Sequence, residues 1–436
     1  MTDYNKELMS FLDKSPTAFH AVASIKKKLV ASGYSELAES EKWELTEGGK
    51  YFVTRNDSSI IAFRVPRFNF TGFMISAAHS DSPAFKVKEN PEIVENGYVK
   101  INVEGYGGML MVPWLDRPLS VAGRIIVKNG NKYEVRLVNV DRDLLLIPNV
   151  AIHMNRDANK GQTWNAQVDM LPVLGSADEA KGSFMRIIAE SAGVSDSDII
   201  SHDLFLYVRD KGKVWGGSEE YISAPHLDDL QCVYGCLEGF LGANNSSSVP
   251  VLAVFDNEET GSLTKQGADS TFLEEVLKRI SLASGKDEEG HYRAVSSSFM
   301  VSADNAHAVH PNHPEKADLI NRPMINKGIV IKFNAAQHYT TDAVSCAVYR
   351  DLCESNDIPV QVFTNRSDTR GGSTLGNVSN AHVSLNTVDI GLAQLAMHSC
   401  YETVGARDTK HLVDAMTVFY SKTFRADAGG SFELLD

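Results

Sequence analysis

Histidines and carboxylates recur where short apolar stretches of this sequence end or a helical pattern begins. The two histidines and three carboxylates at these points are His79, Asp228, Glu259, Asp304 and His398. In an open α/β sheet the carboxyl ends of the strands meet at one edge, and ligands bind there. Imidazole nitrogen and carboxylate oxygen suit Zn²⁺, Mn²⁺ or Co²⁺. The pattern therefore predicts a metal site at this edge of a sheet.

The charge of this set favours two metal ions over one. Three carboxylates that face two divalent cations leave a net charge of about +1, and a bridging water then becomes acidic enough to attack a carbonyl at neutral pH. Five protein groups give each ion three ligands only if one group is shared, so one carboxylate must bridge. The set predicts a hydrolytic site with two divalent ions, Zn²⁺ first, with Mn²⁺ or Co²⁺ as alternatives.

The neighbouring glutamates Glu258 and Glu259 suggest a division of roles. Adjacent side chains of a strand point to opposite faces, so both reach one site only if the chain has left the strand. Asp256, Asn257 and Gly261 around them favour such a turn. One glutamate can then bind metal, while the other stays unligated as general base and acid. Close carboxylates push each other's pKa values apart, which suits that division.

Each feature has an ordinary structural explanation when it stands alone. Asp81 can cap a helix beside a polar His79, and Asp228 can cap the helix that follows it. A glutamate pair such as the one at 258 and 259 usually faces solvent, and an isolated His398 is typical of a core histidine.

A separate zinc site is conceivable at His307, His310 and His313, whose spacing would place them on one helix face. Pro311 and Pro314 break such a helix, so the sequence disfavours this site.

Hydrophobic periodicity predicts the elements that position these residues. Strands are predicted at 50–53, 60–64, 73–78, 249–255, 299–302, 329–333, 360–364 and 383–385. Helices are predicted at 229–241, 272–284, 342–356 and 408–424, after two amphipathic helices in the first forty residues. This alternation is typical of an α/β fold with a largely parallel sheet covered by helices on both faces.

The region from about 88 to 223 differs in texture from the rest of the chain. Strands are predicted at 99–103, 123–127 and 135–140, with an Asn-Gly hairpin turn at 129–130 and one helix at 178–192. We predict that residues 88–223 form a β-rich domain inserted into a catalytic domain of residues 1–87 and 224–436.

The acidic composition of the chain argues against some classes of binding partner. The 436 residues carry a formal net charge of −14, and an acidic surface repels nucleic acid and anionic lipid. The longest apolar run is far shorter than the roughly 20 residues that span a bilayer, so we expect neither nucleic-acid nor membrane partners. The start of the chain lacks a secretory signal pattern, and the five cysteines lack CxxC spacing, so we expect buried free thiols in a cytoplasmic protein.

Five segments, taken in order, resemble the signatures of the aspartyl aminopeptidase family of di-zinc exopeptidases. They are HSDSP at 79–83, HLDDL at 226–230, DNEETGS at 256–262, SADNAHAVHPN at 302–312 and MHS at 397–399. The segments SPT at 15–17 and NVAIH at 149–153 also resemble that family. The resemblance spans nearly the whole chain and implies a zinc-exopeptidase-like fold.

The resemblance also implies a role for each candidate residue. The implied ligands are His79 and Asp304 for one zinc, Glu259 and His398 for the other, and Asp228 as the bridge. It further implies that Glu258 is the general base and that Asp81 orients His79, which is the usual task of a carboxylate beside a ligating imidazole.

Assembly is a further implication of this resemblance. In the family the β-rich insert mediates dimerisation, and dimers build a tetrahedral dodecamer. A histidine matching His153 reaches the active site of a neighbouring subunit, so activity would depend on assembly.

We therefore expect a metallo-aminopeptidase that acts on peptides with a free N-terminus. Lys332 matches a substrate-side lysine of the family and would favour N-terminal Asp or Glu, although a lysine on an alternating strand is otherwise an ordinary solvated residue. The alternatives are an aminopeptidase for neutral residues, a deacylase or carboxypeptidase on the same scaffold, and a non-catalytic assembly protein. The loop at 367–374 has no GxSxG elbow, and its glycines suit either a cleft lining or a simple turn.

Overall fold

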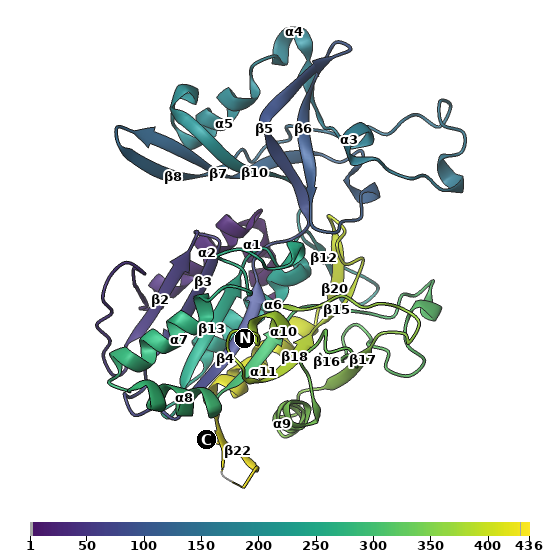
Figure 1. Ribbon diagram of the computed structural model, residues 1–436. Helices are drawn as coiled ribbons and strands as arrows, with labels where there is room; N and C mark the ends of the chain where they lie inside the picture. The colour runs from purple at the N-terminus through teal and green to yellow at the C-terminus, as the bar shows by residue number, and fades with distance from the viewer. Residues whose placement is uncertain (1–2, 428) are drawn as a thin grey trace.

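The computed structural model describes residues 3–427 and 429–436, and its largest element is a nine-stranded sheet (Figure 1). In their order across the sheet the strands are β1 (Ser35–Glu36), β2 (Lys50–Arg55), β3 (Ser59–Arg64), β13 (Val249–Phe255), β4 (Phe73–His79), β14 (Phe299–Ala303), β18 (Asn386–Gly391), β16 (Ile329–Phe333) and β17 (Val360–Thr364). The central strands β13, β4, β14 and β18 run parallel, whereas β3 and β16 flank them antiparallel. The predicted α/β fold is confirmed, with a sheet that is parallel at its centre.

Helices cover both faces of this sheet because its central strands are apolar on both faces. Alternate side chains of a strand point to opposite faces, so Met74 and Ala78 of β4 join one core cluster and Phe73 and Ile75 join the other. The first cluster includes residues of α1 (Tyr4–Asp13), α2 (Ala18–Ala31), α6 (Leu227–Gly242), α9 (Ala343–Glu354) and α11 (Asp408–Ser421). The second includes residues of α7 (Phe272–Ala283), α8 (Glu288–Ser296) and α10 (Leu375–Ser379).

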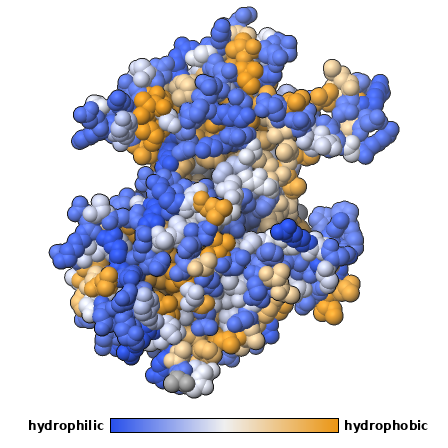
Figure 2. Space-filling model, in the orientation of Figure 1, coloured by the Kyte–Doolittle hydropathy of each residue, from blue (hydrophilic) through white to orange (hydrophobic). Residues whose placement is uncertain are grey.

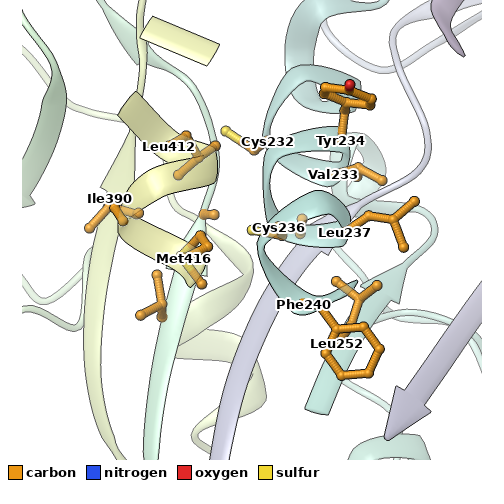
Figure 3. Packing of buried hydrophobic residues seen from close by; sticks show 14 of the residues in the cluster. Cys232, Val233, Tyr234, Cys236, Leu237, Phe240, Leu252, Ile390, Leu412 and Met416 are labelled. Atoms are coloured by element: carbon orange, nitrogen blue, oxygen red, sulfur yellow. The ribbon is translucent and has the colours of Figure 1, made fainter. Parts of the chain in front are cut away.

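Helices α6 and α11 pack side by side against the sheet (Figure 3). Two glycines of α6 allow this close approach. A Cβ on Gly235 would lie 2.5 Å from Leu412 Cδ2, and one on Gly239 would lie 2.5 Å from Met416 Cβ. This packing fixes α6, whose first turn carries Asp228.

A second, six-stranded sheet forms the upper part of the molecule in Figure 1. Its strands, in spatial order, are β8 (Lys132–Asn139), β7 (Leu119–Asn129), β10 (Ile199–Val208), β5 (Ala84–Glu95), β6 (Tyr98–Tyr106) and β9 (Val173–Ser176). The helices of this region are α3 (Ala166–Asp169), α4 (Ala177–Ala180) and α5 (Phe184–Ala192). The sheet has its own apolar core, and the predicted hairpin turn joins β7 to β8. The domain boundaries at 88 and 223 stay a prediction.

A small third sheet and a hairpin complete the fold. The sheet contains β11 (Lys213–Trp215), β12 (Tyr221–Ala224), β20 (Glu402–Gly405), β19 (Ala393–Leu395) and β15 (Ala306–His307). The hairpin pairs β21 (Thr423–Ala426) with β22 (Phe432–Leu435). The sequence does not predict these elements, because strands of two to four residues carry little periodicity.

Two predicted elements are wrong in detail. No strand covers 383–385 within the described chain; Val383 is buried in the loop after α10, and β18 begins at Asn386. Apolar residues can be buried in a loop as well as in a strand, so a short apolar run is ambiguous. The helix predicted at 178–192 is interrupted between α4 and α5, where Gly182 has a φ of 71°.

The five cysteines are buried and form no disulfide, as predicted. Among the helices of the described residues, none combines the length and the apolar character that crossing a membrane requires.

Candidate metal centre

Three neighbouring parallel strands, β13, β4 and β14, bring candidate ligands to one edge of the large sheet. His79 is the last residue of β4, and Asp304 follows directly after β14. A short 3-10 helix, Glu258–Thr260, follows β13. Between β13 and this helix, Asn257 turns the chain with a φ of 62°. As a result, Glu258 and Glu259 both have a carboxylate oxygen close to His79. The predicted turn is confirmed.

Asp228 and His398 reach the same edge from other elements. Asp228 lies in the first turn of α6, and His398 lies in the turn between β19 and β20. Three groups of side chains have ligand atoms within 4.8 Å of one another, and together they contain all five predicted ligands. The groups are His79, Asp228, Asp229 and Asp304; His79, Glu258 and Glu259; and Asp228, Glu259 and His398.

Asp228 lies between the two histidines. Its Oδ1 is 3.6 Å from His79 Nε2, and its Oδ2 is 3.6 Å from His398 Nε2. His398 Nε2 also lies 3.2 Å from Glu259 Oε2. A carboxylate that turns one oxygen to each imidazole has the arrangement expected of a bridging ligand.

Both histidines use Nδ1 for a hydrogen bond to a backbone carbonyl. His79 Nδ1 is 3.0 Å from the carbonyl oxygen of Asp81, and His398 Nδ1 is 2.6 Å from that of Gly108. A carbonyl only accepts, so Nδ1 carries the hydrogen in both rings. Nε2 is then left to bind a metal, and a supporting hydrogen bond of this kind is usual for a ligating histidine.

Two of the assigned ligands have a buried carboxylate oxygen without a donor among the described residues. Within residues 3–427 and 429–436, neither Asp228 Oδ1 nor Glu259 Oε1 accepts a hydrogen bond. Burial of an ionised oxygen is costly unless a partner compensates its charge. A divalent cation would compensate both oxygens, so the residues fit a metal.

The pKa values indicate the same excess of negative charge. Burial, and then the Asp228 carboxylate, raise the pKa of Glu259 well above its usual range. Burial lowers the pKa of His79, but the Asp228 and Asp81 carboxylates near its ring outweigh burial and raise that pKa well above the usual value. Metal binding at this centre would therefore displace protons.

Asp81 and Glu258 lie beside the ligands. The Asp81 carboxylate accepts the backbone N–H groups of Glu258 and Glu259, each at 3.2 Å, and its Oδ1 lies 3.4 Å from His79 Nδ1. Burial, opposed by His79 and reinforced by the nearby carboxylates, raises the pKa of Glu258 to about 8. A carboxyl group with a pKa near neutral pH is suited to proton transfer.

The two predicted substrate-side residues lie in different surroundings. Lys332, on β16, is only 3% exposed, and its Nζ lies 3.6 Å from Asp304 Oδ2. His153 is exposed on the loop after β8 and contributes to none of the three ligand groups found among the described residues. The structure thus places Lys332 beside the ligand Asp304 and leaves His153 outside the ligand groups of the described residues.

Two buried carboxylates of the site lie outside the predicted ligand set. Asp229 Oδ2 accepts the backbone N–H of His79 at 3.2 Å. Glu402 accepts the backbone N–H groups of Asp228 at 3.0 Å and His398 at 2.8 Å. Their only sequence signal is position, since Asp229 adjoins one ligand and Glu402 follows another by four residues.

The remaining sequence candidates lie outside this centre. Within the described part of the chain, His307, His310 and His313 do not form a ligand group. The loop at 367–374, whose glycines suit either a cleft lining or a turn, contributes Ser367, Thr369, Arg370 and Gly371 to the wall of a cleft of about 650 Å³.

The chain is similar to known proteins over nearly its whole length. The family described as "Aminopeptidase I zinc metalloprotease (M18)" matches residues 11–420. A probable M18 family aminopeptidase 2 of Clostridium acetobutylicum is 48% identical over 427 residues, which cover 96% of this chain and 99% of that relative. A probable M18 family aminopeptidase 2 of Pseudomonas aeruginosa is 41% identical, and the match covers 97% of this chain and 99% of that relative.

Solved structures show the same fold. A chain in the cryo-EM structure of the Ape4 and Nbr1 complex superposes with a TM-score of 0.93 at 34% identity, covering 96% of this chain and 85% of that one. The mApe1 dodecamer of S. cerevisiae superposes with a TM-score of 0.84 at 28% identity, covering 96% of each chain. Because the family match spans nearly the whole sequence and contains the residues of the metal centre, this chain belongs to the M18 family of aminopeptidases, which are zinc metalloproteases.

Proposed function

We propose that this M18 aminopeptidase holds two divalent cations, with Zn²⁺ as the first candidate and Mn²⁺ or Co²⁺ as alternatives. The ligands that we assign are His79 and Asp304 for one ion, Glu259 and His398 for the other, and Asp228 as the bridge. The observation that carries this assignment is the pair of Nε2 atoms that approach opposite oxygens of Asp228 at 3.6 Å while both Nδ1 atoms bind backbone carbonyls.

The two cations, when bound, would polarise the first peptide carbonyl of the substrate and lower the pKa of the attacking water. Glu258 takes the proton from that water on its carboxylate and delivers it to the leaving amine. Asp81 holds His79 in place through its backbone carbonyl and its carboxylate, and it fixes the 3-10 helix through the N–H groups of Glu258 and Glu259.

Lys332 is our candidate for a preference for N-terminal Asp or Glu. A buried ammonium group near the site can attract a substrate carboxylate, and the short distance to Asp304 supports this position. An enzyme that prefers neutral residues is the alternative within the same mechanism.

We further propose a dodecamer built from dimers. The similar mApe1 of S. cerevisiae is a dodecamer, and this chain carries exposed apolar side chains over its six-stranded sheet, on the upper part of Figure 2. They include Tyr98, Tyr133, Val135 and Leu137, together with Val150, Ile152 and Met154 around His153.

In this proposal residues 88–223 form the oligomerisation domain, residues 1–87 and 224–436 form the catalytic domain, and His153 enters a neighbouring subunit's site. The assembled protein would be cytoplasmic.

The test is hydrolysis of a panel of aminoacyl chromogenic amides and short peptides. Chelator-stripped protein is compared with protein resupplied with Zn²⁺, Mn²⁺ or Co²⁺, and bound metal is counted for each sample. We expect two ions per chain, metal-restored release of N-terminal residues, and faster release of Asp and Glu than of Leu and Lys.

Other outcomes separate the alternatives. Release of neutral residues alone would support the neutral aminopeptidase and reject the role of Lys332. Release of C-terminal residues or acyl groups, with none from free N-termini, would point to a carboxypeptidase or deacylase. An assembled protein with two ions and no turnover of any of these substrates would favour a non-catalytic assembly protein.

A further inference from the structure

The segment 106–110 connects the six-stranded sheet to the metal centre. It starts at Tyr106, the last residue of β6 in the six-stranded sheet. Strands β4, β13 and β14 of the large sheet end at or just before His79, Glu259 and Asp304, whereas this segment comes from the other sheet. Its contacts reach residues on both sides of the centre.

Tyr106 contacts the side of the centre that includes His79. Its hydroxyl donates a hydrogen bond to Asp81 Oδ2 at 2.7 Å and accepts one from Asn257 Nδ2 at 2.8 Å. The ring itself packs edge-on against Phe205 of β10, with 5.5 Å between the centroids. The hydroxyl therefore belongs to the hydrogen-bond network that holds the Asp81 carboxylate beside His79.

The next residues contact the side that includes His398 and Glu259. The Gly108 carbonyl accepts the hydrogen on His398 Nδ1 at 2.6 Å, and the Leu110 N–H donates to the His398 carbonyl at 3.0 Å. Gly107 has a φ of 73°, and a Cβ there would lie 3.1 Å from Glu259 Cβ. The chain of this segment thus lies directly against the second pair of ligands.

We infer that segment 106–110 positions both halves of the metal centre, with Tyr106 as a positioning residue that acts through Asp81 and with Gly107 and Gly108 placing Glu259 and His398. This inference rests on the proposed two-metal function. It implies that the seating of the six-stranded sheet on the large sheet sets the geometry of the centre. A change in how that sheet sits would therefore alter metal affinity at a site to which it contributes no ligand.

The physical reason is that outer hydrogen bonds orient metal ligands and tune their affinity. Without the Tyr106 hydroxyl, Asp81 keeps its bonds to the N–H groups of Glu258 and Glu259 but loses the donor that comes from the second sheet. Asp81 and the His79 ring it contacts are then held less firmly. The ring of a phenylalanine at 106 would keep the packing against Phe205.

The first test is Tyr106→Phe, with Tyr292→Phe on the exposed face of α8 as the matched control. Zinc affinity of the full chain is measured by competition with a chromophoric chelator, and kcat and KM are measured on one aminoacyl amide. We expect Tyr106→Phe to bind one of its two zinc ions about tenfold more weakly and to lose kcat at saturating zinc, while Tyr292→Phe behaves as wild type.

The second test is Gly107→Ala, with Gly97→Ala as the matched control. Both glycines have a positive φ, of 73° and 82°, but a Cβ on Gly97 would meet nothing within 4 Å. Both variants therefore introduce the same kind of backbone strain, but only the added Cβ of Gly107→Ala contacts Glu259. We expect weaker zinc binding in Gly107→Ala alone.

Three results would overturn the inference, and they differ from one another. If wild type binds fewer than two zinc ions, the proposed two-metal function fails and takes this inference with it. If wild type binds two and both Tyr106→Phe and Gly107→Ala keep wild-type affinities, the positioning role alone fails. If the variants unfold at lower temperature but bind zinc and turn over as wild type does, the segment has only a structural role.

Discussion

Lys332 and Asp304 form a buried ion pair at the edge of the metal centre. Nζ lies 3.6 Å from Oδ2, and the ammonium also lies 5.5 Å from the centroid of the Tyr339 ring. Burial lowers the pKa of Lys332, but Asp304 and the other carboxylates outweigh burial and raise it, so the side chain stays protonated. One buried positive charge therefore faces a proposed zinc ligand.

Replacement of this charge should change substrate choice more than overall turnover. We expect Lys332→Met to lower kcat/KM for Asp and Glu amides by about tenfold or more relative to the Leu amide, because a charge-assisted hydrogen bond to the substrate carboxylate is lost. Lys327→Met removes the same charge from an exposed position shortly before β16 and serves as the control. An equal loss on all three amides would show that Lys332 supports Asp304 and does not select the substrate.

Glu258→Gln should abolish proton transfer and keep the metals. The substitution preserves size, and the backbone N–H of residue 258 that binds Asp81 is unchanged. We expect kcat to fall by about 10²-fold or more, as is typical when a general base is removed. Metal content by elemental analysis and the thermal unfolding curve should match wild type. Turnover near the wild-type rate with both metals bound would rule out the assigned role.

The central fold and the ligands are predictable from the sequence because both leave local signals. A strand such as β4 is buried on both faces, so it forms a continuous apolar run, and His79 stands at its end. The same holds for β13 and the two glutamates that follow it. Parallel pairing of these strands then brings their ends to one edge.

Supporting contacts between distant parts of the chain leave no such signal. His398 and the carbonyl of Gly108 are 290 positions apart, and Tyr106 reaches Asp81 from a different sheet. Glu402 receives two backbone N–H groups, which come from elements that only the tertiary fold brings together. Such contacts depend on how the sheets sit on each other, and local periodicity carries no information about that.

Removal of metal should make stability depend on pH. Burial raises the pKa of Glu258 from about 4.5 to about 8, and the pKa of Asp256 to about 7, with the Asp81 carboxylate adding to the second shift. Folded metal-free protein therefore binds more protons than unfolded protein in this window, so its free energy of unfolding falls as pH rises from about 4.5 to about 8. The raised pKa of His79 acts in the same direction.

We expect the unfolding temperature of chelator-treated protein to drop across that window. Zinc-loaded protein should show a smaller drop, because the cations compensate the carboxylates, so the stabilisation by zinc should grow with pH. The measurement is thermal unfolding at fixed ionic strength with and without zinc. Parallel curves for the two forms would contradict the assignment of Glu258 and Glu259 to the metal centre.

A mixture of two inactive variants should regain activity if His153 serves a neighbouring subunit. His153 is exposed and belongs to no ligand group within the described part of its own chain, so His153→Ala should lose activity with its zinc intact. Glu258→Gln is inactive but still carries His153. Co-expression of both variants places some intact Glu258 sites next to an intact His153 of another subunit.

With random equal mixing and one donor per site, roughly a quarter of the wild-type activity should return. Separately purified variants that are mixed without exchange of subunits are the control, and co-expressed assemblies as inactive as that control would show that His153 does not act across subunits.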